Sequence, residues 1–148
     1  MATSYFIPTE PLLAALTTAA FRGVKVRLLL SGRGSYRWML YAGRAYYDVL
    51  LDAGVEIYEY QKGLLHCKTL TVDGNWSLVG TANFDVRSLL LNFEVGVAVY
   101  DEEMARQLET VFEKDVAVAQ PIDVETWQRR GVGQRVIENS LKLFSPVL

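Results

Sequence analysis

The sequence is poor in the residues from which disulfides and metal sites are built. Its 148 residues include one cysteine, Cys67, and one histidine, His66. A single cysteine excludes a disulfide within the chain, which fits a reducing compartment. Because there is no cluster of cysteine and histidine, we expect no zinc site, and nothing in the sequence requires a metal or another cofactor.

Long apolar runs and an excess of basic charge are also absent. No run reaches the roughly 20 apolar residues that cross a bilayer, and residues 1–6 lack the basic and apolar regions of a secretory signal. We therefore expect neither a signal nor a transmembrane segment in this chain. The formal net charge is -2 and the pI is about 5.4, which argues against a protein held on nucleic acid by bulk electrostatics.

The composition is that of a chain that folds. Hydrophobic residues make up 51% of it and charged residues 22%, so enough apolar surface is present to build a core. The length suits one compact domain over residues 1–148. Within this domain, residues 122–148 are expected to form an amphipathic tail.

Strand-like runs alternate with helical patterns along the chain. Strands are expected at residues 4–8, 24–30, 55–60 and 93–100. Helices are expected between the capping residue Thr9 and Gly23, at residues 36–53, and after the capping residue Asp101. The third helix is expected to bury Met104, Leu108, Val111 and Phe112.

A β-hairpin is the most local of these expectations. Residues 68–72 and 77–80 flank the turn sequence Asp73-Gly74-Asn75, which is a strong hairpin signal. Pro121 breaks the pattern that follows the third helix. The alternation of strands and helices predicts an α/β domain with a mixed β-sheet.

Two pairs of polar residues with the same spacing flank this hairpin. His66 and Lys68 are two residues apart, so on a strand both side chains point to one face, and Cys67 points to the other. Thr81 and Asn83 have the same spacing after a glycine. The hairpin can bring the two pairs together, so that an imidazole, an ammonium, a hydroxyl and an amide converge.

Such a set of groups suits a phosphodiester. A lysine supplies a positive charge for a nonbridging oxygen, and the amide and hydroxyl add donors. A neutral histidine can attack phosphorus if an acceptor holds its other ring nitrogen. Glu94 is a candidate for that acceptor, whereas Cys67 is interpreted as a packing residue.

The pattern His66-x-Lys68-x4-Asp73-x6-Gly80-Thr81-x-Asn83 matches the signature of the phospholipase D superfamily at every position. From Ser4 onward, the chain also resembles the second half of bacterial cardiolipin synthases. The similar segments include residues 5–8, 23–27, 46–47, 54–60, 76–80 and 92–94. The length and fixed spacing of the motif make a chance match a poor explanation.

The resemblance implies roles for the motif residues. His66 resembles the phosphohistidine position of the family, or the general acid that is paired with it. Lys68 and Asn83 resemble its phosphate ligands, and Thr81 occupies the position of a hydroxyl near the site. Glu94 resembles the residue that orients the histidine.

Other residues have structural or less certain roles. Asp73 and Gly80 belong to the motif, and the resemblance implies a structural role for them. In the resembled family the loop at Gly32-Arg33-Gly34 lies near the site, so Arg33 is a candidate substrate contact, as is Arg37. The same loop is equally well interpreted as a plain connection. Arg87 either binds a phosphate or pairs with a nearby acid.

The single histidine is the main departure from the family. Active sites of the superfamily use two such motifs, one histidine attacking and the other protonating the leaving group. This chain therefore needs a second half-site, supplied either by the missing part of a two-motif enzyme or by a second copy of itself. The likeness to a second half favours the first interpretation.

The resemblance implies an α/β domain with a mixed β-sheet flanked by helices on both faces. It implies phosphatidyl transfer, by transesterification or hydrolysis, on phospholipids such as phosphatidylglycerol, through a phosphohistidine and without a metal. The alternatives are a homodimeric phosphodiesterase or nuclease, and an inactive lipid-binding fragment. Expected partners are the phospholipid, the second half-site and an anionic membrane surface on the cytoplasmic side of a bacterial membrane, and nucleic acid is not expected.

The expected membrane contact depends on the tail. Val136 or Ile137 shares a helical face with Leu141 and Phe144, and arginines flank Trp127. An apolar face, an interfacial tryptophan and a basic flank are typical of a peripheral membrane helix. The alternative is a terminal helix packed on the core of the domain.

Overall fold

The computed structural model describes residues 1–33 and 37–143 of the chain. Its strands are β1 (Ala2–Thr3), β2 (Phe6–Ile7), β3 (Arg27–Ser31), β4 (Glu56–Tyr60), β5 (Lys68–Val72), β6 (Trp76–Gly80), β7 (Phe84–Asp85), β8 (Gly96–Tyr100) and β9 (Ala119–Pro121). Its helices are α1 (Glu10–Phe21), α2 (Arg37–Arg44), α3 (Tyr47–Asp52), α4 (Val86–Leu90), α5 (Glu102–Val116), α6 (Val124–Gln128) and α7 (Val132–Lys142).

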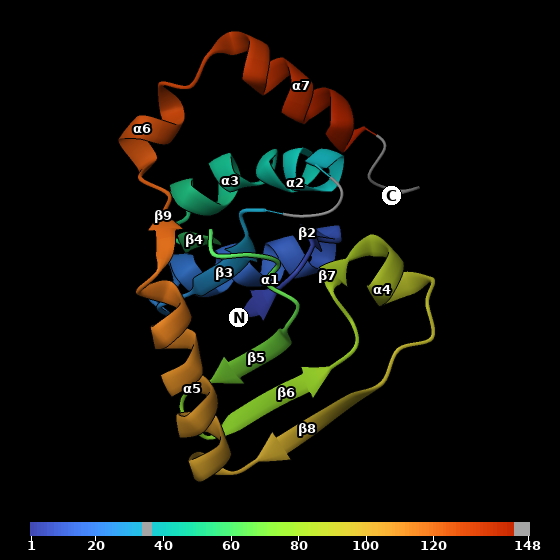
Figure 1. Ribbon diagram of the computed structural model, residues 1–148, viewed down its shortest axis with the longest axis vertical. Helices are drawn as coiled ribbons and strands as arrows, with labels where there is room; N and C mark the ends of the chain where they lie inside the picture. Colours follow the sequence, from blue (N-terminus) through green and yellow to red (C-terminus); the bar gives the residue numbers. More distant parts are fainter. Residues whose placement is uncertain (34–36, 144–148) are drawn as a thin grey trace.

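Within the described ranges, a seven-stranded mixed sheet runs in the order β8-β6-β5-β1-β3-β4-β9 (Figure 1). Its centre is parallel, because β1 pairs with β3 and β3 with β4 in the same direction. The pairs β1–β5, β5–β6, β6–β8 and β4–β9 are antiparallel. A short parallel pair, β2–β7, lies apart from this sheet. The predicted mixed sheet is confirmed.

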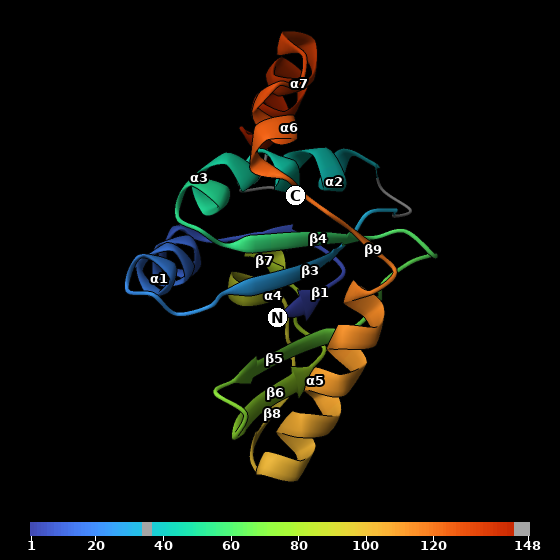
Figure 2. The ribbon, with the colours of Figure 1, turned by 90° about the vertical axis from the view of Figure 1, so that its left-hand side faces the viewer.

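The central strands are covered by helices on both faces, as expected (Figure 2). Leu28 and Leu30 of β3 belong to one cluster of buried side chains, together with apolar residues of α1, α2 and α3. Leu29, which alternates with them, belongs to a second cluster, against which Phe112 and Val116 of α5 pack. The alternation of a strand thus places successive leucines under different helices.

The opposite end of the sheet is bare. Every residue of β8 except Val99 is exposed, and the segment that precedes β8 is exposed and apolar as well. We name this region the α4–β8 surface and define it by Leu90, Leu91, Phe93, Val95 and Val97, each of which is more than half exposed. Figure 1 shows this segment swinging away from the sheet between α4 and β8.

The predicted hairpin is confirmed, and its turn has the expected chemistry. Strands β5 and β6 pair with Thr71 opposite Ser77. Asp73 and Gly74 both adopt positive φ, 51° and 67°, which is the pattern of a type I′ turn and the reason that Asp-Gly is favoured there.

Two predicted elements differ in the structure. Of the strand expected at residues 4–8, only Phe6 and Ile7 form a strand, β2, while β1 precedes the expected range and belongs to a different sheet. The helix expected at residues 36–53 consists of α2 and α3. The amide of Tyr46 bonds to the carbonyl of Gly43, three residues back, and this tighter turn ends the α-helical ladder.

Three smaller expectations are corrected. The strands expected from Val24 and Phe93 begin later, at Arg27 and Gly96. Pro121 ends an additional strand, β9, and is tolerated there because β9 is at the edge of the sheet. Asp101 caps α5 as expected, accepting a hydrogen bond from the amide of Met104, but Val111 faces solvent.

The tail packs on the domain, so two parts of the membrane interpretation are wrong. Trp127 is buried, and its ring lies 5.1 Å from that of Tyr47. Arg130 binds Asp48 at 2.8 Å and the fully buried Glu138 at 3.0 Å. The predicted interfacial tryptophan and one of its flanking arginines therefore hold α6 and α7 against α2 and α3.

Helix α7 is oriented with polar groups inward. Glu138 is buried, Gln134, Leu141 and Lys142 are half-buried, and Glu138 accepts a hydrogen bond from Gln134. The side chains of Val132 and Val136 on the opposite face are exposed. Phe144, which the membrane interpretation also used, lies outside the described residues.

Candidate active site

The predicted pair His66 and Lys68 meets where β5 begins. Lys68 is the first residue of β5, and His66 lies in the segment before it. The Lys68 Nζ atom lies 3.4 Å from His66 Nε2 and 3.3 Å from the His66 carbonyl oxygen. The imidazole is exposed and the ammonium half-buried, so both groups are open to a ligand from solvent.

Ser4 is the residue that the sequence did not indicate. Its side chain is buried in the bend between β1 and β2. Its Oγ atom lies 3.4 Å from His66 Nδ1 and 3.2 Å from Lys68 Nζ. The pairing of Thr3 with Lys68 brings these residues together, and no spacing within the sequence reveals a pairing between segments so far apart.

Asn83 is connected to this group through Thr3. The Thr3 Oγ1 atom lies 3.5 Å from Asn83 Oδ1 and accepts a hydrogen bond from the amide of Phe84 at 3.3 Å. Thr3 is fully buried. The segment that carries Asn83 is therefore held beside β1, next to Ser4.

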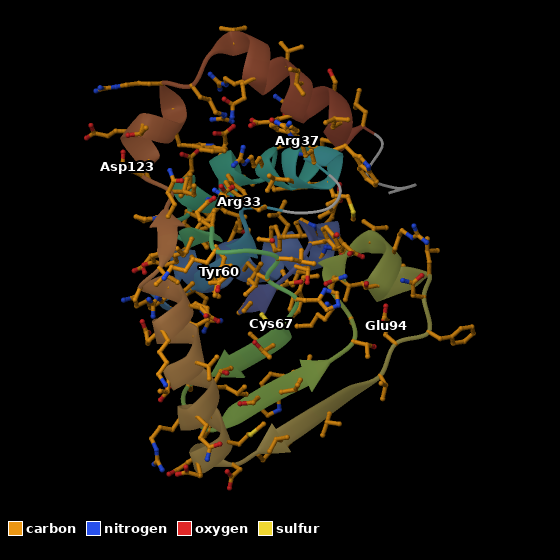
Figure 3. All side chains as sticks on the ribbon, viewed as in Figure 1. Arg33, Arg37, Tyr60, Cys67, Glu94 and Asp123 are labelled. Atoms are coloured by element: carbon orange, nitrogen blue, oxygen red, sulfur yellow. The ribbon has the colours of Figure 1, made fainter. Side chains whose placement is uncertain are left out.

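Thr81 and Glu94 form a second group beside the first. The Thr81 hydroxyl donates to the Glu94 carboxylate and accepts from the amide of Val95 at 3.0 Å, and the Asn92 amide donates to Glu94 at 3.3 Å. The Thr81 hydrogen bond, followed by that of Asn92, lowers the pKa of Glu94. Figure 3 shows Glu94 on the segment that leads to β8.

The residue beside the Nδ1 atom of His66 differs from the one expected. The oxygen at His66 Nδ1 belongs to Ser4, whereas Glu94 bonds to Thr81 and Asn92. Burial lowers the pKa of Lys68, and the negative charges of Glu94 and Asp85 act in the opposite direction. Glu94 therefore acts electrostatically on Lys68.

The remaining candidates belong to other elements. Arg33 and Arg37 are exposed near α2 (Figure 3). Arg87 is exposed on α4. The loop Gly32-Arg33-Gly34, interpreted above as a possible neighbour of the site, includes Gly34, which lies outside the described residues. Asp73 lies in the β5–β6 turn, away from these contacts.

Gly80 occupies a position that only glycine fits. A Cβ atom on Gly80 would lie 2.6 Å from the Val95 carbonyl oxygen and 3.0 Å from the Gly96 Cα. The register pairs Gly80 with Gly96. This close approach of β6 and β8 places Thr81 beside Val95, and with it Glu94.

Other chemistry finds little support at this site. Cys67 packs against the cluster under α5, and burial raises the pKa of its thiol, so the thiolate is disfavoured. Among the described residues, no group of three or more His, Cys, Asp or Glu side chains is arranged to hold a metal.

The described helices include none with the length and apolar character needed to span a membrane.

Two solved structures have a similar fold. The chain superposes on Nuc from Salmonella typhimurium, a phospholipase D family member, with a TM-score of 0.71 and 21% identity, covering 82% of this chain and 79% of Nuc. It superposes on phosphatidylserine synthase from Haemophilus influenzae Rd KW20 with a TM-score of 0.75 and 17% identity, covering 99% of this chain and 38% of that protein.

The chain belongs to the family described as "Cardiolipin synthase, PLD-like domain", which it matches over residues 1–116. It is 44% identical over 148 residues to cardiolipin synthase 2 of Bacillus anthracis, and 45% identical over 148 residues to a cardiolipin synthase of Geobacillus sp. (strain WCH70). It is covered completely in both comparisons but spans only 29% and 30% of these relatives.

Proposed function

We propose that this chain provides one half of the active site of a phosphatidyltransferase that acts on phospholipids, as in a cardiolipin synthase. The observation that carries the proposal is the contact of His66 with Lys68 at the surface of a domain of this family. The imidazole is a nucleophile and the ammonium stabilises charge on phosphate oxygens. Asn83 and Thr81 add polar groups at the edge of the same region.

The proposed reaction has two steps. First, His66 Nε2 forms a bond to phosphorus, the bond between phosphorus and an alcohol oxygen breaks, and the departing alcohol takes a proton from a general acid. The product is a phosphohistidine. Second, an acceptor hydroxyl gives its proton to that same group and attacks phosphorus, which releases His66. With phosphatidylglycerol as both donor and acceptor, the products are glycerol and cardiolipin.

In a scheme with two histidines, the general acid comes from outside this chain, because His66 is its only histidine. The relatives are about three times as long, so we propose that their remaining part supplies it. The α4–β8 surface suits such a partner, because it is contiguous, apolar and next to Glu94. A second copy of the chain is the other source of a histidine and would give a homodimeric phosphodiesterase.

The test combines the chain with the complementary part of a similar cardiolipin synthase and measures transfer between phosphatidylglycerol molecules. His66→Ala should lower kcat by at least about a thousandfold, as expected for the loss of a nucleophile. Lys68→Ala should lower kcat by a smaller factor than His66→Ala. Lys68→Arg, which keeps the charge, should lower kcat by a smaller factor still. Transfer that persists in His66→Ala contradicts the proposal, and turnover by the chain alone as a dimer favours the homodimer.

A lipid substrate also requires access to a membrane surface. We propose that the outer face of α7, with Val132, Val136 and the exposed Arg135, contacts anionic lipid. Vesicles of phosphatidylglycerol should bind the chain better than neutral vesicles, and less well as salt increases. Val136→Asp should weaken this binding, whereas Val111→Asp, on the exposed side of α5, should not.

A further inference from the structure

Ser4 is placed between the two groups that the proposed reaction uses. Its Oγ atom lies 3.4 Å from His66 Nδ1 and 3.2 Å from Lys68 Nζ. The side chain is 4% exposed, so water does not compete freely for this oxygen. A hydroxyl oxygen can accept two hydrogen bonds, and two donors are within reach.

The arrangement decides which ring nitrogen carries the proton. An ammonium group has three donors and no acceptor. Lys68 Nζ lies 3.4 Å from His66 Nε2, and this contact is favourable only if Nε2 presents its lone pair. The proton of the neutral ring is then on Nδ1, from which it is donated to Ser4 Oγ.

The backbone holds Ser4 in this place. Ser4 follows β1, which is in the seven-stranded sheet, and precedes β2, which pairs with β7 in another. Its neighbour Thr3 is fully buried and bonds to the Tyr5 carbonyl at 3.0 Å. The carboxylate of Glu94 bonds to Thr81 and Asn92, which leaves Ser4 as the oxygen at Nδ1.

We infer that Ser4 is a positioning residue that keeps neutral His66 in the Nδ1–H tautomer, with Nε2 directed at the open side of the site. That Nε2 attacks phosphorus rests on the proposed function. The tautomer itself does not, because it follows from the contacts with Ser4 and Lys68 alone.

The single histidine makes this inference directly measurable. In a chain labelled with nitrogen-15, every imidazole resonance belongs to His66, and the two ring-nitrogen shifts give the tautomer ratio in the neutral ring. We expect Nδ1–H to predominate. Ser4→Ala should lower the ratio of Nδ1–H to Nε2–H by about fivefold, the change that one hydrogen bond of about 1 kcal/mol gives.

Two control variants separate this role from a structural one. Ser4→Thr keeps the hydroxyl and should keep the wild-type ratio. Ser77→Ala removes the same atoms from another fully buried serine, on β6, and should leave the ratio unchanged. If Ser4→Thr does not fold, a second readout is the rate at which diethyl pyrocarbonate modifies His66. This rate is measured in Ser4→Ala and in Ser77→Ala. Only Ser4→Ala should slow the modification.

The inference is overturned if Nε2–H predominates in the wild-type chain, or if Ser4→Ala folds and has an unchanged ratio. These results are obtained without substrate. They therefore remain distinct from the outcome of the His66→Ala transfer assay, which tests the proposed function.

Discussion

Strands β3 and β8 each have three apolar residues at the centre, but their environments are opposite. Residues 27–31 read Arg-Leu-Leu-Leu-Ser and residues 96–100 read Gly-Val-Ala-Val-Tyr. The leucines of β3 are buried under helices on both faces, whereas nearly all of β8 is exposed at the edge of the sheet. The domain thus has a covered region that can stabilise itself and a bare region that lacks a cover within the described residues.

The active-site candidates lie at the boundary of these two regions. Ser4 and Thr3 belong to the covered side, and Thr81 and Glu94 to the side that leads to β8. A partner that covers the bare region would therefore arrive beside His66. The covered region accounts for the stability of the domain. A complete active site would instead need the partner proposed above.

The largest effect is expected in the covered region, at the ion pairs of the tail. Arg130→Ala should lower the free energy of unfolding by about 3–5 kcal/mol, because it leaves the buried Glu138 without its cation. Arg129→Ala is the matched control. Its side chain is exposed and 3.8 Å from Glu125, so the loss should stay below about 1 kcal/mol.

Urea unfolding of both variants measures this difference. Equal losses of stability in the two variants would show that Arg130 does not hold the tail to the domain. The tail would then not belong to the covered region.

A pair of truncations compares the two strands themselves. Leu28→Ala should cost about 2–5 kcal/mol, since it leaves a cavity in a packed cluster. Val97→Ala on β8 should change stability by less than about 0.5 kcal/mol, because the side chain already faces water. Thermal unfolding followed by circular dichroism is sufficient. A large loss in Val97→Ala would mean that the chain covers β8 itself, for instance by self-association.

The bare region should matter for association. Phe93→Ala should weaken binding of the complementary part of a cardiolipin synthase by about tenfold, as is common for an aromatic anchor. Phe21, at the end of α1, is equally a phenylalanine exposed to solvent, so Phe21→Ala is the control and should leave the dissociation constant unchanged. Titration calorimetry reads both, and equal effects would remove the α4–β8 surface as the docking site.

The smallest expected effect is a loss of thermal stability at low pH. The hydrogen bond from Arg130 lowers the pKa of Asp48. A lowered pKa contributes stability that is present above the ordinary value of about 3.9 and is lost as the pH falls through the lower value of the folded state. The melting temperature should therefore decrease below about pH 4. Asp48→Asn should reduce this dependence, and Asp52→Asn, at the end of α3, should not.

Local chemistry explains what the sequence predicted well. The residue types at Asp73 and Gly74 predict the turn that they form. The contact of His66 with Lys68 follows from the two-residue spacing of this pair. Ser4 was missed because its position depends on pairing between β1 and β5, which are far apart in the chain. Only long-range packing creates that neighbourhood.

The tail was predicted only in part, for a different physical reason. The amphipathic pattern allowed either a membrane-facing helix or a helix packed on the core, and α7 packs on the domain with Glu138 buried and Val136 exposed. The ion pairs with Arg130 make this orientation favourable. A pattern of hydrophobicity cannot reveal that Arg130 is held by Asp48, which is distant in sequence, and pairs with the buried Glu138.

The meander of β5, β6 and β8 has a consequence for the order of folding. Strands β5 and β6 pair across a tight turn, a kind of contact that can form within microseconds, and β6 pairs with β8 across the longer connection of residues 81–95. The meander buries little, however, and a small sheet of this kind is marginal in water. Its persistence depends on more distant segments, among them α5 and the residues Ala2 and Thr3 that pair with β5. Because Ser4 follows Thr3, the pairing of β1 with β5 is also the step that brings Ser4 to His66, so that on refolding the imidazole should acquire its hydrogen-bond partner only when this long-range contact forms.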